Sequence, residues 1–314
     1  MNETLDRFGD LLARTSPGIE IRRTEPLSKH TSFRIGGPAD IFLIPTEQCQ
    51  LLAIARAISE LKVPCLYLGK GSNLLVRDGG VRGVVVKIAE NFSRVEFEGK
   101  RCSAHSGALL AGVSRGAAAR GLRGLEFACG IPGSIGGGVM MNAGAYGGEM
   151  RDVVTHVTVV TEDGILKRLP AGELEFGYRK SVLQSRTWLV TNVEMDLCPD
   201  DPERTLARMS VNQYLRESKQ PLDWPSAGSV FKRPPGKFVG PMIQALGLKG
   251  AHEGGAQISE KHAGFIINVG GASAADVLAL IRRVRDAVWD RYQVMLETEI
   301  RIVGEDQVSA ASKR

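Results

Sequence analysis

The sequence predicts an α+β protein built of two or three packed units, and three observations support this fold class. Stretches with an apolar residue at every third or fourth position, typical of amphipathic helices, alternate with short apolar runs that are typical of buried strands. The chain has 314 residues, and because a domain usually has about 100 to 200 residues, it can form more than one core. Its hydrophobic content of 43% is that of a globular protein and excludes a disordered or fibrous chain.

The first half of the chain contains two expected helices before its glycine-rich part. Residues 1–20 have the pattern of a polar amphipathic helix followed by a Pro-Gly turn. A second helix is predicted after Thr46, its expected N-cap, with an apolar face formed by Leu51, Ile54, Ile58 and Leu61. The other elements expected here are apolar runs at 63–68, 74–76 and 83–88, a hairpin at 94–105 and a small-residue helix at 108–120.

The second half adds strands and ends in a strongly patterned helix. Its expected elements are strands at 153–161 and 188–197, a Pro- and Asp-rich linker at 198–202, a helix at 203–216, a short helix that ends at Gly247 and a strand at 264–269. The last helix is predicted to begin after Ser273, because Asp276 stands three residues later in the capping-box position. A closing strand at 296–303 follows, and we expect the small and polar residues 305–314 to be frayed.

The charge, the cysteines and the histidines exclude several classes of protein. The net charge of +5 and the pI near 9.0 suit anionic ligands, but basic residues are mixed with acidic ones, so nucleic-acid binding is not expected. The five cysteines contain no CxxC spacing and the five histidines no ligand spacing, so neither a disulfide scaffold nor a metal site is predicted. No apolar stretch approaches the roughly 20 residues that span a bilayer, and residues 1–18 have no sustained apolar h-region. We therefore expect no membrane insertion and a cytoplasmic location.

Two glycine clusters point to a phosphate-bearing ligand. Residues 128–150 hold eight glycines, and Gly69 to Asn73 form a tight polar turn between two apolar runs. Glycine this dense suits backbone that approaches a ligand closely, whereas a flexible linker, the alternative, has fewer apolar residues. The turn is not a P-loop, because no GxxxxGK[ST] string occurs, and it is not a Rossmann fingerprint, because the third glycine is absent and the position about 20 residues on, Asn91, is not acidic. By itself a GxG is more often an ordinary turn.

Seven segments together resemble one enzyme family. They are TSFRIGGPAD (31–40), LGKGSNLLV (68–76), GIPGSIGGGVMMNAGAYG (130–147), GYRKS (177–181), AGSVFKRP (227–234), HAGFIIN (262–268) and LETEIRIVG (296–304). In this order they are similar to the signature segments of UDP-N-acetylenolpyruvoylglucosamine reductase, also called UDP-N-acetylmuramate dehydrogenase. The resemblance covers residues 24 to 304 and implies an oxidoreductase of peptidoglycan precursor synthesis, hence of cell-wall biogenesis, cell shape and cell division.

The resemblance also implies a fold and a division into domains. The expected fold is α+β, with a two-lobed FAD-binding domain of the vanillyl-alcohol-oxidase type and a C-terminal α/β substrate-binding domain. The expected ranges are 1–23 for an N-terminal helical extension, 24–199 for the FAD-binding domain with subdomains near 24–88 and 89–199, 200–304 for the substrate-binding domain, and 305–314 for a disordered tail.

The cofactors that the resemblance implies are non-covalently bound FAD and NADPH. The residues that match the family's flavin contacts come from four motifs: Arg34, Gly69, Lys70, Gly71, Ser72, Asn73, Leu74, Gly133, Ser134, Gly137, Asn142, Ala143, Gly144, Ala145, Tyr146 and Arg301.

Three residues match the family's catalytic positions: Ser229 as proton donor, Arg179 as the catalytic arginine and Glu299 as the catalytic acid. The roles suit the chemistry, because reduction of an enol ether that carries a carboxylate needs a proton donor and a clamp for the developing negative charge. In an extended strand Glu297 and Glu299 share a face, so Glu297 is the rival for the acidic role. Without the motifs, Ser229 would be read as a turn residue and Arg179 as a surface residue.

The substrate that the resemblance implies is UDP-N-acetylglucosamine enolpyruvate, with Lys219, Tyr178 and Asn268 as binding residues. An interval of 50 residues from Arg179 to Ser229 resembles the shorter form of the family, which lacks an inserted tyrosine loop. Two alternatives remain: an FAD-dependent alcohol or sugar oxidase of the same fold, for which Cys129 is the candidate attachment residue, and a non-catalytic module that binds flavin or a nucleotide sugar. The sequence does not fix the oligomeric state, and we expect a monomer.

Overall fold

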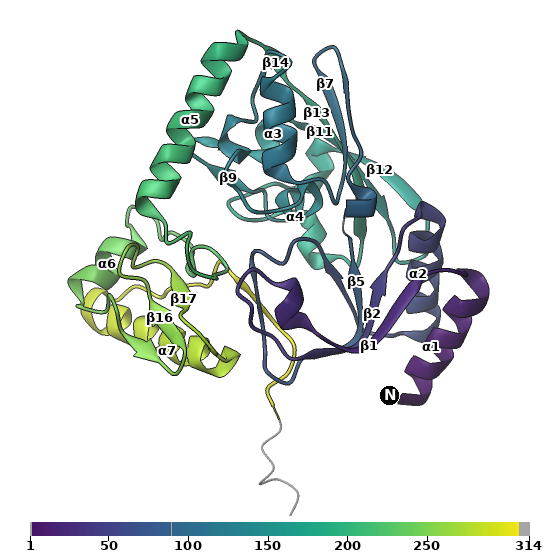
Figure 1. The fold of residues 1–314 in the computed structure, drawn as a ribbon, viewed down its shortest axis with the longest axis horizontal. Coiled ribbons are helices and arrows are strands. Elements are labelled where there is room, and N and C mark those ends of the chain that lie inside the picture. The colour runs from purple at the N-terminus through teal and green to yellow at the C-terminus, as the bar shows by residue number, and fades with distance from the viewer. Residues whose placement is uncertain (1, 89, 308–314) are drawn as a thin grey trace, which may run out of the picture. The chain divides into compact units, whose positions relative to one another are not determined.

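The computed structural model describes residues 2–88 and 90–307, which divide into two compact units (Figure 1). Unit 1 comprises Met1–Arg23, Ile41–Lys70 and Gly83–Arg216, and unit 2 comprises Thr24–Asp40, Gly71–Arg82 and Glu217–Arg314. Each unit is therefore assembled from segments far apart in the sequence. The domain ranges expected from the sequence are continuous instead, and as functional domains they stay a prediction.

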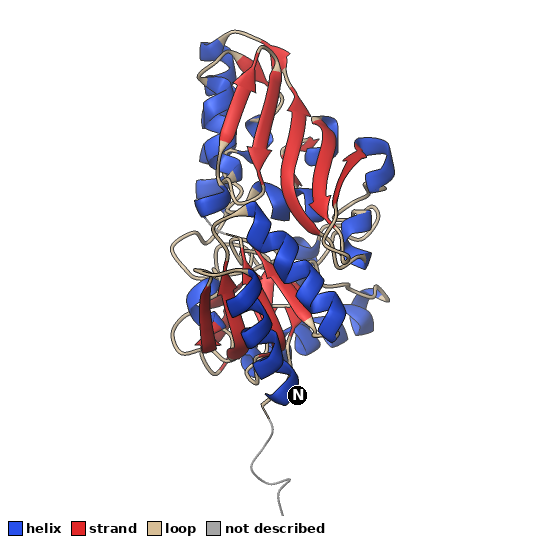
Figure 2. Cartoon of the chain, turned by 90° about the vertical axis from the view of Figure 1, so that its right-hand side faces the viewer, coloured by secondary structure: helices blue, strands red, loops and turns tan. Residues whose placement is uncertain are grey.

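A five-stranded antiparallel sheet forms the larger part of unit 1 and is seen in red in Figure 2. Its strand order is β12-β11-β13-β7-β6, with β6 at Val95–Glu98, β7 at Arg101–His105, β11 at Val154–Val160, β12 at Leu166–Pro170 and β13 at Leu189–Asp196. Along β13 buried Val193 and Met195 alternate with Asn192, Glu194 and Asp196, as expected for a sheet with one covered face. The hairpin and the two strands expected from the sequence are confirmed.

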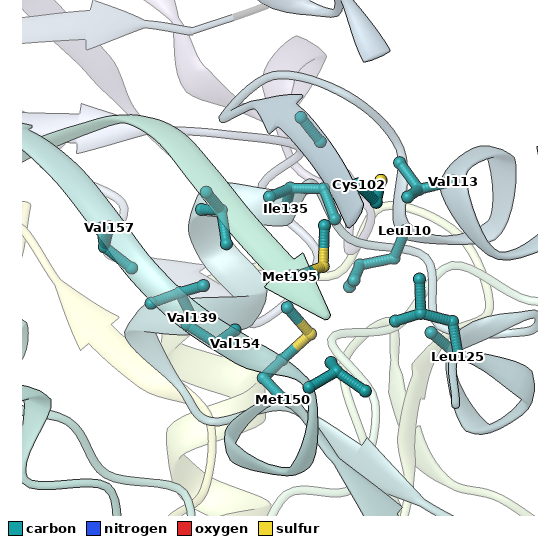
Figure 3. Packing of buried hydrophobic residues seen from close by; sticks show 14 of the residues in the cluster. Cys102, Leu110, Val113, Leu125, Ile135, Val139, Met150, Val154, Val157 and Met195 are labelled. Atoms are coloured by element: carbon teal, nitrogen blue, oxygen red, sulfur yellow. The ribbon is translucent and has the colours of Figure 1, made fainter. Parts of the chain in front are cut away.

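The covered face of this sheet carries the core of unit 1. Helices α3 (Leu110–Ala118) and α4 (Ile135–Met140) supply apolar side chains to it. Figure 3 shows Ile135 and Val139 of α4 lying beside Met195 of β13, and all three are at most 1% exposed. Burial of such a side chain stabilises the fold by about 1.5–3 kcal/mol. The glycine-rich segment, of which α4 is the middle part, is therefore anchored in a packed core.

A second sheet, most of whose residues belong to unit 1, has the order β1-β2-β5-β3. The strands are β1 (Glu20–Pro26), β2 (Pro38–Ile44), β3 (Cys65–Leu68) and β5 (Val81–Lys87), and helices α1 (Asn2–Thr15) and α2 (Gln48–Leu61) pack against one another beside it. The predicted N-cap of α2, Thr46, is wrong: Glu47 is the N-cap and forms a capping box with Gln50. The Thr46 N–H instead donates to Gln50 Oε1 at 2.7 Å, so the glutamine serves both residues.

Residues 198–202, which were expected to form a linker, instead contain a short strand and the first residue of a helix. Cys198–Pro199 forms β14, which pairs with β8 (Leu122–Arg123), and α5 (Pro202–Lys219) begins directly afterwards. Two more short strands, β9 (Gly144–Ala145) and β10 (Gly148–Glu149), form a hairpin inside the glycine-rich segment. Single turns of 3-10 helix lie at Leu27–His30, Glu90–Phe92, Glu126–Ala128, Met150–Asp152, Ala171–Leu174 and Val182–Ser185.

Unit 2 contains a small antiparallel sheet, two helices and a parallel strand pair. The sheet is formed by β15 (His252–Glu253), β16 (Ala256–Ile258) and β17 (Ile266–Asn268), and the helices are α6 (Val239–Ala245) and α7 (Ala274–Tyr292). Ser273 and Asp276 form the predicted capping box of α7. The closing strand is shorter than predicted: β18 covers Arg301–Val303 and pairs in parallel with β4 (Leu74–Val76).

The end of the described chain is held in place. The Glu305 N–H donates to the Gly80 carbonyl at 2.9 Å, so the first residues of the expected tail are ordered, whereas 308–314 lie outside the described residues. Within residues 2–88 and 90–307, no helix has the length and apolar character needed to cross a bilayer.

Candidate active site

The loop after β3 offers unpaired backbone amides. In unit 2 the N–H groups of Gly71, Ser72 and Asn73 donate to no protein atom of the described chain, and in unit 1 the same holds for Lys70. Two glycines are required by close contacts: a Cβ at Gly69 would lie 2.5 Å from Ser134 Oγ, and one at Gly71, whose φ is +66°, 2.3 Å from the His30 carbonyl oxygen. Successive unpaired N–H groups in such a turn form a concavity that binds anions.

Lys87, at the end of β5, adds a positive charge to the unit 1 side of this loop. Its Nζ donates to the Gly69 carbonyl at 2.5 Å. Burial and then the neighbouring charge of Lys70 lower the pKa of Lys87 from 10.5 to about 8, against a smaller opposite effect of Glu90. A cation that is destabilised in this way is stabilised when an anion binds beside it. Sequence analysis missed Lys87, for which the sequence gives only a lysine that follows three valines.

The glycine-rich segment presents fewer amides than its composition indicates. The Ile135 and Gly136 N–H groups donate to the carbonyls of Ala108 and Ser106 at 2.8 and 2.9 Å, so both are already used. Gly137 has open space around the position of a Cβ, where only Ser134 Oγ lies within 4 Å. Tyr146, 43% exposed and with φ +52°, lies at the tip of the β9–β10 hairpin. A flat ligand can therefore approach this segment at Gly137 and Tyr146.

Arg179 lies in a tight turn of unit 1. Gly177 and Lys180 exchange two backbone hydrogen bonds of 3.0 and 3.1 Å, so Tyr178 and Arg179 are the central residues, and Arg179 has φ +54°. Its Nη2 donates to the Gly144 carbonyl at 2.8 Å, which joins the guanidinium to the glycine-rich segment. Tyr178 is 51% exposed, and the Arg179 guanidinium carbon lies 5.2 Å from the centre of its ring.

Strained backbone marks the predicted site residues. Arg34, Asn142, Tyr146 and Arg179 all have a positive φ, between +40° and +56°. For residues with a side chain this conformation costs of order 1–3 kcal/mol, and it is concentrated at functional sites because the surrounding structure must enforce it. Among the other four non-glycine residues of this kind in the described chain, Lys62 and Gln293 are ordinary helix C-caps.

Unit 2 brings Ser229 and Glu299 to neighbouring backbone segments. The residue after Ser229, Val230, accepts a hydrogen bond of 2.7 Å from the Glu299 N–H. Asn73 of the amide-lined loop holds the same segment, since its Nδ2 donates to the Glu299 carbonyl at 3.2 Å and its carbonyl accepts from the Arg301 N–H at 2.9 Å. The segments of Ser229, Glu299 and Asn73, widely separated in sequence, are thus joined by backbone hydrogen bonds and by the Asn73 side chain.

The geometry separates Glu299 from its rival Glu297. The Glu297 carboxylate is 73% exposed and forms an ion pair of 3.0 Å with Lys232. Glu299 is half-buried and belongs to the segment that Asn73 holds. The two acids therefore occupy different environments, which favours Glu299 for the acidic role.

The residues expected to bind the substrate differ in how much of each side chain is left for a ligand. Lys219 is exposed at the end of α5, and the adjacent Gln220 has a buried Oε1 with no hydrogen-bond partner in the described chain. The Asn268 amide is used in part: its Nδ2 donates one hydrogen to the Phe33 carbonyl, and its Oδ1 accepts from the N–H groups of Gly270 and Ala272. A substrate role for these residues stays a prediction.

Arg216 of α5 was not singled out by sequence analysis. It is half-buried against Gly130, where a Cβ would lie 2.7 Å from its Cδ, and no carboxylate pairs with it in the described part of the chain. Burial lowers the pKa of its guanidinium, with Tyr146 and Cys129 as its polar neighbours. Nothing in the local sequence distinguishes it from the other arginines of that helix.

The residues present fit an FAD and do not fit a metal. In unit 1 the lysines Lys70 and Lys87 suit a phosphate and the open face at Gly137 and Tyr146 suits a ring system. In unit 2 the unpaired amides after Lys70 suit a phosphate. No group of three or more His, Cys, Asp or Glu residues within 2–88 and 90–307 could hold a metal ion, and all five cysteines are unbridged. The site as described is that of a flavoprotein.

Comparisons with known proteins agree with this description. Residues 39–170 match a family model described as FAD binding domain, so the chain is an FAD-dependent oxidoreductase. Residues 220–303 match the model of the UDP-N-acetylenolpyruvoylglucosamine reductase C-terminal domain. The chain is 48% identical over 295 residues to the UDP-N-acetylenolpyruvoylglucosamine reductase of Alkaliphilus oremlandii, which spans 94% of this chain and 97% of the relative. It is 49% identical over 286 residues to that of Geobacillus kaustophilus, which spans 91% and 94%.

A solved structure extends the comparison to the fold. The crystal structure of UDP-N-acetylenolpyruvylglucosamine reductase from Thermus caldophilus has a TM-score of 0.79 and 37% identity, and covers 91% of this chain and 99% of its own. The chain belongs to the UDP-N-acetylenolpyruvoylglucosamine reductase family. The expected fold class, an FAD-binding domain followed by the C-terminal domain of this family, is confirmed.

Proposed function

We propose that the chain catalyses the NADPH-dependent reduction of UDP-N-acetylglucosamine enolpyruvate to UDP-N-acetylmuramate, a step of peptidoglycan precursor synthesis. Family membership supports the reaction, and one structural observation supports the assignment of residues. Within unit 2 the Glu299 N–H donates to the carbonyl of Val230, which follows Ser229, and the Asn73 side chain donates to the Glu299 carbonyl. A non-catalytic binding module would not require these three positions to meet.

The reaction adds a hydride to one alkene carbon and a proton to the other. When bound, FAD supplies the hydride, which it takes from NADPH. The Ser229 hydroxyl donates the proton to the neighbouring carbon, and the serine is a sufficient acid because the enolate that forms is strongly basic. The Ser229 alkoxide is then reprotonated from solvent. The product differs from the substrate by two hydrogen atoms.

The other two residues act on the charge that develops during this step. The Arg179 guanidinium is planar and permanently charged, so it can bind the substrate carboxylate through two hydrogen bonds. The Gly144 carbonyl holds Nη2 and fixes the direction of the group. Glu299 orients the reacting end of the substrate beside Ser229. Such preorganised groups stabilise the transition state because they need not rearrange when charge appears.

The covalent oxidase alternative depends on Cys129, which is a poor attachment residue. Its thiol is 9% exposed and packs with Ala118 and Met209. Burial raises the pKa of the thiol, against smaller effects of Arg216 and nearby backbone amides, so little thiolate is present near neutral pH. This supports non-covalent FAD. The monomeric state and the cytoplasmic location stay predictions.

Anaerobic stopped-flow absorbance tests the function. We expect NADPH to bleach the flavin without sugar nucleotide, and UDP-N-acetylglucosamine enolpyruvate to restore the colour with formation of UDP-N-acetylmuramate, measured by mass spectrometry. Acid precipitation should release all FAD into the supernatant. A reduced flavin that reacts with O₂ but never with the enol ether would refute the proposal.

A further inference from the structure

Asn142 is fully buried, and all its amide groups are used inside unit 1. It is 0% exposed and has φ +40°. Its Nδ2 donates to Glu149 Oε2 at 2.9 Å and to the Gly177 carbonyl at 3.0 Å, and its Oδ1 accepts from the Arg151 N–H at 2.9 Å. The orientation of the amide is unambiguous, because a carbonyl can only accept and a backbone N–H can only donate. The side chain has no hydrogen left to donate to a cofactor.

The Gly177 carbonyl that Asn142 binds is the base of the turn that carries Arg179. This oxygen accepts from the Lys180 N–H, which closes the turn, and from Asn142, so two donors fix its direction. Two residues after Asn142, the Gly144 carbonyl accepts from the Arg179 guanidinium. Residues 142–144 of the glycine-rich segment therefore hold the turn at two points. Asn142 binds the Gly177 carbonyl, and the Gly144 carbonyl binds the Arg179 guanidinium.

We propose that Asn142 is a positioning residue for Arg179: its buried amide sets the place of the Gly177–Lys180 turn and thereby the direction of the guanidinium. This inference rests on the proposed function and replaces the flavin contact that the resemblance implied for the Asn142 side chain. The left-handed backbone of Asn142 is part of the arrangement, since it is needed to aim the amide at Gly177 and Arg151 together. Asparagine tolerates this conformation better than most residues with a side chain.

Exchanging the amide of Asn142 and the carboxylate of Glu149 tests the hydrogen bond from Asn142 to the Gly177 carbonyl. Asn142→Asp removes the donor to the Gly177 carbonyl and places the new carboxylate beside that of Glu149. Combining it with Glu149→Gln supplies an amide donor for the new aspartate, and the Arg151 N–H keeps its acceptor. In the Asn142→Asp/Glu149→Gln double variant the bond to the Gly177 carbonyl is missing and an aspartate oxygen faces that carbonyl, and the ion pair of Glu149 with Arg151 is lost as well. Glu149→Gln alone is the reference for the lost carboxylate.

Both half-reactions of these variants are measured by anaerobic stopped-flow absorbance. We expect the double variant to retain FAD and to be bleached by NADPH at a near-normal rate. Reoxidation by the enol ether should slow about 10- to 100-fold through kcat rather than KM, because misplacement of a catalytic group by about 1 Å can cost 10²-fold. In an Arg179→Ala background the swap should cause no further loss, because the residue that it positions is absent.

A matched control is Ser181→Ala, which removes another hydrogen bond of 2.8 Å between the same two segments, from Ser181 Oγ to the Met140 carbonyl, outside the turn. We expect it to leave both half-reactions near normal. Wild-type rates of reoxidation in the double variant, or equal losses in the double variant and in Ser181→Ala, would overturn the positioning role. A wild-type protein that never reduces the enol ether would instead refute the proposed function, so the two failures are distinguishable.

Discussion

The two units hold their candidate catalytic residues in different ways. In unit 2 the segments of Ser229 and Glu299 are held mainly by backbone hydrogen bonds, which no side-chain substitution removes directly. In unit 1 the turn of Arg179 is held by the buried side chain of Asn142 and by the guanidinium itself. Substitutions in unit 2 should therefore reveal chemical roles, whereas substitutions in unit 1 should also reveal supporting residues that touch no ligand.

The largest effect is expected for Ser229→Ala. The backbone around Ser229 does not depend on its hydroxyl, so the flavin should still be bleached by NADPH at a near-normal rate. Reoxidation by the enol ether should fall by about 10⁴-fold, the upper range for loss of a general acid. Stopped-flow absorbance measures both rates, and Ser229→Cys should recover part of the loss because a thiol can also donate a proton. An increase in KM with unchanged kcat would show that Ser229 only binds the substrate.

A smaller effect is expected for Glu299→Gln. The Glu299 backbone N–H and carbonyl keep their partners Val230 and Asn73, so the fold should be unchanged. Withdrawal of the carboxylate should slow reoxidation by about 10²- to 10³-fold, as is typical when a preorganised electrostatic group is removed. Thermal unfolding followed by circular dichroism checks the fold, and a large drop in melting temperature would contradict the assignment.

A pH effect on cofactor affinity is expected from Lys87. Its pKa in the unliganded chain is lowered to about 8, and the FAD pyrophosphate should raise it again, so binding takes up a proton above pH 8. The dissociation constant should be constant below pH 8 and rise by at most about tenfold per pH unit above it, since one proton is involved. Calorimetric titration of apoprotein with FAD measures this dependence. It should vanish in Lys87→Met and in Lys87→Arg, and a dependence that persists in Lys87→Met would assign the proton to another group.

The smallest effect is expected for Glu297→Gln. The exposed pair with Lys232 contributes only about 0–1 kcal/mol to the free energy of unfolding. Both half-reactions should keep near-normal rates, and urea unfolding should show little change. A loss of reoxidation comparable with that of Glu299→Gln would assign the acidic role to Glu297 as well.

Much of the fold could be predicted from the sequence, because strong local signals determined it. The capping box of α7 and the hairpin of β6 and β7 appear in the structure as expected. Predictions of single positions failed where two residues compete, as for the N-cap of α2, where the Glu47 side chain accepts from the Gln50 backbone N–H. The shortened closing strand reflects its partner, since β4 has only three residues to pair with it.

The candidate site could likewise be predicted only in part from the sequence. The positions of Ser229, Arg179 and Glu299 come from motifs, and composition alone would not have distinguished them. The role of Asn142 could not be predicted, because it depends on contacts with Glu149, Arg151 and Gly177 that only the folded chain brings together. Lys87 and Arg216 could not be predicted for a related reason. Burial, in Lys87 together with a neighbouring positive charge, lowers the pKa of each side chain, and sequence spacing does not reveal this.

The pairing of β4 with β18 bears on how the protein is made. The partner of the Asn73 side chain, the Glu299 carbonyl, lies 226 residues later in the chain. Leu74 pairs with Arg301, near the end of the described structure. During translation the α-helices and hairpins of unit 1 can form as they leave the ribosome, but the β4–β18 pair of unit 2 cannot form until Arg301–Val303 have been synthesised. A nascent chain that stops short of Arg301 therefore contains Asn73 and β4 without their partners, and it exposes an unpaired strand edge until β18 is made.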